Sequence, residues 1–136
     1  MLAIIVVVLV GAAAMAVDLG WLYWPSIEVQ HGADAAALAG VIYEPDQRAE
    51  AHEAGLAAAA ENGFVDTSMD GSDVVEVIDF IDDPTAVPRN NQLRASVTHK
   101  VPTFFLKVFG LNNVEIKRTA VAQYNLPLFL GSPPRC

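Results

Sequence analysis

The sequence predicts an α+β fold in which a long N-terminal apolar helix and a second helix cover a small antiparallel three-stranded sheet. The first 17 residues contain no charged or polar side chain. Alanine-rich stretches of helix-forming residues follow, and beyond residue 72 apolar and polar residues alternate with the period of a β-strand. We expect an apolar membrane or assembly helix at 1–43, an α+β head domain at 44–125 and a proline-rich tail at 126–136.

Residues 1–24 form a stretch long enough to cross a bilayer, which takes about 20 apolar residues in a helix. Only Asp18 interrupts it, and its end carries the interface-type aromatic residues Trp21, Tyr23 and Trp24. A cleaved secretory signal would have a basic leader, and no Lys or Arg precedes Arg48. A buried helix of a soluble core is rarely apolar on every side over this length. We therefore expect a retained membrane or assembly helix.

The first helix is expected to continue through Pro25 to about residue 43. Residues 26–42 are mostly helix formers, and Pro25 removes only the hydrogen bond to the carbonyl of Trp21. This predicts a continuous rod that is kinked near Pro25. The alternative is a true break, with Ser26 capping a separate helix. We prefer the rod because no other turn signal occurs there.

The head domain is predicted from turn residues and a change of period. Asp46 is expected to cap a second helix from residue 47 to about 62, which Gly63 ends. A short helix is expected within 102–110, with Thr103 as its cap and Gly110 as its stop. Alternation predicts three strands, at residues 73–81, 92–101 and 113–123. The two N-terminal helices are expected to cover the apolar face of the sheet.

Composition and motifs exclude several function classes. The net charge is −8, and an acidic surface repels phosphate backbones, so we expect no nucleic-acid partner. The three histidines have no ligand spacing, and the single cysteine, Cys136, lies in the proline-rich tail, which is a poor place to activate a nucleophile. His99 shares the apolar side of its strand and is expected to be buried or half-buried. We expect neither catalytic activity nor a cofactor.

One segment resembles the front half of a calcium loop, in which oxygen ligands occupy alternate positions before a glycine. Its candidate ligands are Asp66, Ser68, Asp70 and Asp73. The twelfth position, where a bidentate glutamate is expected, is Val77. Ordinary turn chemistry explains the same residues without a metal, so we expect no metal site.

Asp18 is the most informative charge, because a carboxylate within an apolar helix is costly unless it is solvated or paired. One alternative places it at headgroup depth in contact with water. The other pairs it with the terminal amino group of a neighbouring copy, since Asp18 lies about 26 Å from Met1 along an ideal helix. The sequence leaves both open.

Small residues along the rod predict close approach of helix backbones. The small residues that we expect to take part in assembly are Gly11, Ala14, Ala33, Ala37 and Gly40. Asp18 and Pro25 are the other two candidate assembly residues.

Two blocks of the sequence resemble a known family. The first runs from Ala16 to Tyr23 (AVDLG-x-LY) and continues at 30–40 (Q-x-x-ADAAALAG). The second begins at 101–105 (VPTFF), followed by FGL at 109–111, VEI at 114–116 and TAVA at 119–122. Both are similar to TadE/TadG-like proteins of the tight-adherence (Tad, Flp-type) pilus system. Together they cover most of residues 1–123.

The resemblance implies a pilin-like subunit of an extracellular filament on the cell surface, inserted in the inner membrane before assembly. Its implied partners are copies of itself and the pilus assembly machinery. The alternative is a membrane-anchored accessory protein that does not polymerise. Family members usually begin with a basic leader that a prepilin peptidase removes, so we expect the mature form or part of a longer chain.

Overall fold

The computed structural model describes residues 1–44, 46–65, 73–79 and 91–125. Its elements follow the order α1 (Leu2–Val41), α2 (Arg48–Glu61), β1 (Asp73–Asp79), β2 (Gln92–Pro102), the 3-10 helix η1 (Leu106–Phe109) and β3 (Asn113–Gln123). The strands form one antiparallel sheet in the order β1-β2-β3. The predicted α+β class is confirmed.

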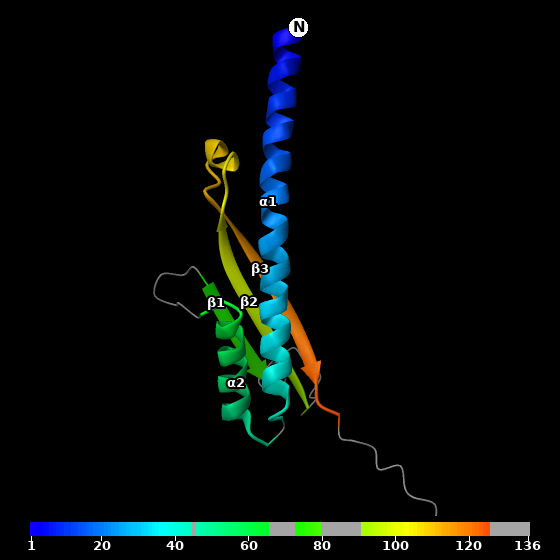
Figure 1. Ribbon diagram of the computed structural model, residues 1–136, viewed down its shortest axis with the longest axis vertical. Coiled ribbons are helices and arrows are strands. Elements are labelled where there is room, and N and C mark those ends of the chain that lie inside the picture. Colours follow the sequence, from blue (N-terminus) through cyan, green and yellow to red (C-terminus); the bar gives the residue numbers. More distant parts are fainter. Residues whose placement is uncertain (45, 66–72, 80–90, 126–136) are drawn as a thin grey trace, which may run out of the picture.

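Helix α1 is a single helix of 40 residues that contains Pro25. It runs through the proline without a break, so the separate helix starting at Ser26 is excluded (Figure 1). Proline costs a helix one backbone hydrogen bond, and the flanking alanine-rich and valine-rich turns maintain the rod on either side.

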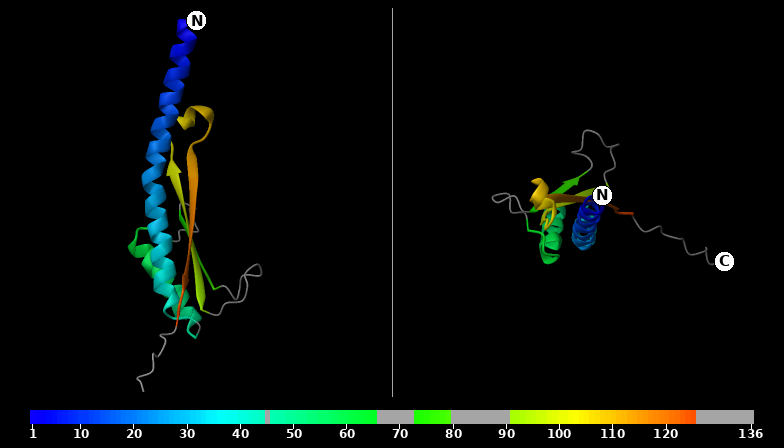
Figure 2. Two further views of the ribbon diagram at one scale, coloured as in Figure 1. Left: turned by 90° about the vertical axis from the view of Figure 1, so that its right-hand side faces the viewer. Right: turned by 90° about the horizontal axis from the view of Figure 1, so that it is seen from above.

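The two helices lie on the same side of the sheet, as the view along the long axis shows (Figure 2). Helix α1 packs on β2 and β3, and α2 packs on β1 and on α1. The core between the layers is built mainly from small and β-branched side chains, with Leu93, Val97 and Val29 almost fully buried. Only the second half of α1 contributes to this core, because its buried hydrophobic residues all fall between Val29 and Val41.

Tight contacts hold α2 against α1. A Cβ at Gly40 would lie 2.6 Å from the carbonyl oxygen of Ala51, and one at Gly55 would lie 3.2 Å from that of Ala36. Glycine at both positions allows the two backbones to approach this closely.

The predicted N-terminal cap of α2 is corrected, and its predicted C-terminal glycine is confirmed. Asp46 does not cap α2, whose N-cap is Gln47 and has no side-chain hydrogen bond. The N–H of Gln47 donates to the carbonyl of Tyr43 at 2.9 Å, so backbone bonds form the turn between the helices. Gly63 follows the end of α2 with φ of 91°, as its predicted role requires.

The strand predictions agree with the structure within the described residues. Strand β3 has the predicted bounds, β2 extends one residue further to Pro102, and β1 is described up to Asp79. Residues 66–72, residues 80 and 81 of the first predicted strand, the following residues 82–90 and the predicted tail at 126–136 lie outside the described residues.

Candidate functional site

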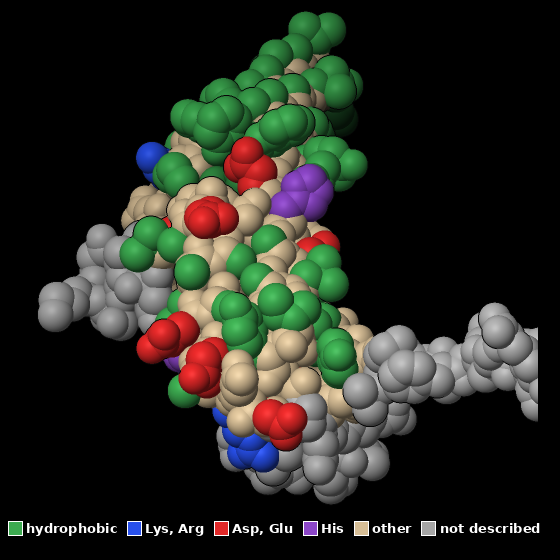
Figure 3. All heavy atoms as spheres, turned by 60° about the horizontal axis from the view of Figure 1, so that its bottom comes forward, with side chains coloured by type: hydrophobic (Ala, Val, Ile, Leu, Met, Phe, Trp, Pro, Cys, Tyr) green, Lys and Arg blue, Asp and Glu red, His purple; other side chains and the backbone are tan. Residues whose placement is uncertain are grey.

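The N-terminal half of α1 projects beyond the head domain (Figure 1). Its large hydrophobic side chains are exposed to solvent, and they cover the face seen in Figure 3. Each large hydrophobic residue in the first ten positions is at least 49% exposed. Helix α1 is long and apolar enough to cross a membrane. Water-exposed apolar surfaces of this kind are rare in soluble proteins, so lipid or other protein chains must cover it.

Asp18 lies where the projecting half of α1 meets the head domain, and it is only 1% exposed. Its carboxylate accepts three backbone N–H groups from the segment that leads into η1. The N–H of Phe104 donates to Oδ1 at 3.0 Å, and those of Phe105 and Leu106 donate to Oδ2 at 3.0 and 2.6 Å. A carboxylate is a strong acceptor for such amides, so Asp18 joins α1 to the connection between β2 and β3.

This arrangement contradicts the solvated alternative for Asp18, while the pairing with a neighbouring copy stays a prediction. The solvated alternative is wrong, because the side chain is buried. The carboxylate also has hydrogen-bond partners in its own chain without any second copy. Asp18 therefore satisfies the amides at the start of η1, the role that the sequence analysis gave to Thr103.

Thr103 has a different function from the predicted one. Its hydroxyl donates to the carbonyl of Leu111 and, at 3.2 Å, to that of Asn112. It therefore closes the base of the β2–β3 connection and is not the cap of η1. Gly110 ends η1 in the left-handed region at φ of 85°, as expected.

Aromatic residues surround this junction. Trp21 packs against Phe104 edge to face, with the ring centroids 5.1 Å apart. Trp24 and Tyr23 are exposed, and the Nε1–H of Trp24 donates to Glu28 at 2.8 Å. The aromatic cluster predicted for the lipid–water boundary thus lies beside the hydrogen bonds that join Asp18 to the β2–β3 connection.

The predicted small assembly residues fall into two groups. Gly11 and Ala14 lie partly exposed on the projecting half of α1. Ala33, Ala37 and Gly40 are buried among the chain's own core residues. Within the single chain, these three residues already allow α1 to pack closely against the head domain.

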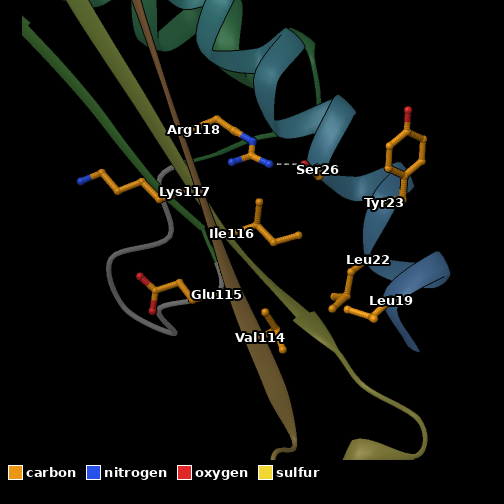
Figure 4. A pocket seen from close by; sticks show the side chains of 9 residues that line it. All are labelled: Leu19, Leu22, Tyr23, Ser26, Val114, Glu115, Ile116, Lys117 and Arg118. Atoms are coloured by element: carbon orange, nitrogen blue, oxygen red, sulfur yellow. Dashed lines mark hydrogen bonds between the residues drawn. The ribbon is translucent and has the colours of Figure 1, made fainter. Parts of the chain in front are cut away.

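A groove of about 420 Å³ lies between α1 and the first part of β3 (Figure 4). Leu19 and Leu22 of α1 and Val114 and Ile116 of β3 give it apolar walls, and the Arg118 guanidinium donates to the Ser26 hydroxyl at 2.5 Å across one end. Small-ligand sites usually bring several polar groups together on one point, and the side chains here do not converge in that way.

The calcium candidates are not assembled into a site within the described residues. Asp66, Ser68 and Asp70 lie outside them. The Asp73 carboxylate contacts the imidazole of half-buried His99, its direct partner across β1 and β2. In the described part of the chain, no group of three or more His, Cys, Asp or Glu residues is placed to hold a metal ion.

A projecting apolar helix on an α+β head defines a membrane-anchored protein. A comparison with protein families matches residues 34–122 to the family Tad_C, described as Tad-like Flp pilus-assembly. The chain belongs to this family, because the match covers more than half of its length and most of the head domain. The predicted relation to the Tad pilus system is confirmed. Comparisons with curated proteins and with solved structures give no significant match.

Proposed function

We propose that this chain is a pilin-like structural subunit of a Tad-type filament on the cell surface. The observation that supports this most is the projecting half of α1, which is apolar on all sides and belongs to the same continuous helix as the half that packs in the head domain's core. Before assembly, this half lies in the inner membrane. In the filament, the same half packs against its counterparts in other copies, with the head domains outside.

The two environments of the helix are physically compatible. Lipid tails and neighbouring apolar helices both keep its side chains out of water, so moving from one to the other exposes no large apolar surface. Helix association then depends on close packing, for which small residues are suited. Gly11 and Ala14 lie on the projecting half and provide such positions. The proposed role is structural and involves no chemical reaction.

A membrane-anchored accessory protein is the alternative, because the same helix would serve as a permanent anchor. Gold-labelled antibodies against the head domain separate the two roles in electron micrographs of filaments sheared from cells. A structural subunit gives label at regular intervals along the filament. Label confined to the membrane fraction would favour the accessory role and contradict the proposal.

Substitution of small residues by leucine tests packing without reducing hydrophobicity. Gly11→Leu and Ala14→Leu should leave membrane insertion intact and lower the yield of sheared filaments by about tenfold or more, because bulk prevents close approach. Val10→Leu is the matched control, since it changes an already large residue in the same turn. Equal filament yields from all three inserted variants would contradict packing through these small residues.

A further inference from the structure

The connection between β2 and β3 carries a second exposed apolar surface, which we call the apolar tip (residues 104–111). Its outward side chains are strongly exposed, reaching 83% at Val108 and 75% at Phe109. The other exposed hydrophobic residues of the tip are Phe104, Phe105 and Leu111. The tip therefore keeps bulky apolar side chains in contact with solvent in the single chain.

The apolar tip is a built structure, held in place by contacts at its base. The carboxylate of Asp18 binds the amides of Phe104, Phe105 and Leu106. The N–H of Leu111 donates to the carbonyl of Leu106 at 3.1 Å, which closes the turn behind Gly110. This conformation holds the hydrophobic side chains outward, in contact with water. Folding them back against the head domain would remove them from water, which is favourable for apolar groups.

The apolar tip lies beside the proposed membrane segment of α1. Figure 1 shows η1 directed toward the N-terminal end of α1, past the ends of β2 and β3. The tip is attached at Asp18, and its Phe104 ring packs against Trp21 of α1. Trp and Tyr side chains are enriched at the lipid–water boundary, and the exposed Tyr23 and Trp24 lie next to Trp21 in α1. With the projecting half of α1 in a bilayer, the tip is level with that boundary.

We infer that the apolar tip is a second membrane contact, which inserts into the leaflet facing the head domain while α1 crosses the same bilayer. This rests on the membrane stage of the proposed function. The tip and α1 would then hold the head domain at two points and fix its orientation on the membrane. A single helix would leave the head free to turn about the helix axis.

The charge pattern favours lipid as the occupant of this surface. The chain has a net charge of −8, yet between Lys100 and Glu115 its only charged side chain is Lys107, and no acid occurs. An exposed lysine among aromatic and aliphatic residues suits the headgroup region, where the amine reaches lipid phosphates and the rings lie at the boundary. The exposed aromatic side chains of Trp21, Tyr23 and Trp24 on α1 continue the same belt.

Spin labels on the full chain test this inference in vesicles of phosphatidylcholine and phosphatidylglycerol. In a Cys136→Ser background, nitroxides are attached at Val108→Cys and, as a second tip position, at Phe109→Cys. Val121→Cys is the matched control, because it is an exposed valine on β3, 53% exposed and eight residues beyond the first residue of the strand. Val8→Cys reports separately on α1. The measured quantity is how often each nitroxide collides with a paramagnetic reagent. Frequent collision with oxygen indicates a nitroxide in lipid, and frequent collision with a water-soluble nickel chelate indicates a nitroxide in water.

Both tip labels should show an oxygen-to-nickel collision ratio several-fold above that of the Val121 label, as expected for apolar side chains at the acyl boundary. A ratio equal to the control would overturn the inference. Tip labels shielded from both reagents would also overturn it, since they would indicate a protein partner. If Val8 reports lipid while the tip reports water, only this inference fails. If Val8 itself reports water, the membrane stage of the proposed function fails with it.

Discussion

Asp18 joins two segments that lie 86 residues apart in the chain, the projecting helix and the start of η1. Its presence in an apolar helix indicated a special role, but the sequence did not reveal the partner, because backbone amides carry no residue signature. Helix caps are predicted from residues next to the helix in the sequence, so Thr103 was predicted as the cap of the short helix. The only available signal was the isolated carboxylate itself.

Asp18→Asn should release the connection between β2 and β3 from α1. An asparagine has one acceptor oxygen and turns an N–H donor toward amides that are themselves donors. We expect hydrogen exchange at Phe104, Phe105 and Leu106 to accelerate by about tenfold or more. Exchange at buried Val97 should remain nearly unchanged.

Glu28→Gln is the control for this experiment, because it changes a carboxylate on the same helix that accepts an exposed hydrogen bond from Trp24. Unchanged exchange at the three amides in Asp18→Asn would show that the carboxylate does not hold this connection.

Gly40→Ala tests the close approach of α1 and α2. The new methyl group would lie 2.6 Å from a backbone oxygen that cannot move without shifting α2. We expect a loss of about 1–3 kcal/mol in unfolding free energy, measured by circular dichroism of the full chain in detergent. Gly20→Ala is the control, because its new methyl group would meet nothing within 4 Å beyond the adjoining turns of its own helix, and it should be neutral or slightly stabilising. A Gly40→Ala variant as stable as the control would exclude tight packing at this site.

At the scale of elements, periodicity predicted most of what the structure contains. Strand β2 was predicted to within one residue because its polar and apolar residues alternate over a long run. The start of α2 was less predictable, since backbone hydrogen bonds from Tyr43 onward form that turn without the Asp46 side chain. Burial of Ala33 and Ala37 by the chain's own head was also not predictable, because small residues suit contacts within a chain and between chains equally.

Pro25 lies within α1, between its projecting half and its buried half. Replacing it with alanine restores a backbone donor and removes the ring clash with the preceding turn. Under the proposed function, Pro25→Ala should change the helical rise or twist of the filament, measured by electron microscopy. Ala12→Ser, a small change on the projecting half, should leave both parameters as in the wild type. Identical geometry in Pro25→Ala and wild-type filaments would exclude a role for the proline in subunit orientation.

The whole molecule separates an apolar rod from a charged head. Hydrophobic side chains cover the N-terminal half of α1, whereas charged side chains gather on the rest of the molecule (Figure 3). The sequence predicted this division from its first 17 residues, which have no polar side chain. It did not predict that the apolar tip rises beside the rod, because only the folded hairpin brings residue 104 next to residue 18.

Cryo-electron microscopy of filaments sheared from cells tests the central claim most directly. The account predicts a helical reconstruction in which this chain is the repeating unit and residues 1–17 of neighbouring copies contact one another along the filament axis. The head domains should lie outside. Filaments in which this chain is absent from the repeating unit, while it remains in the membrane fraction, would contradict the account.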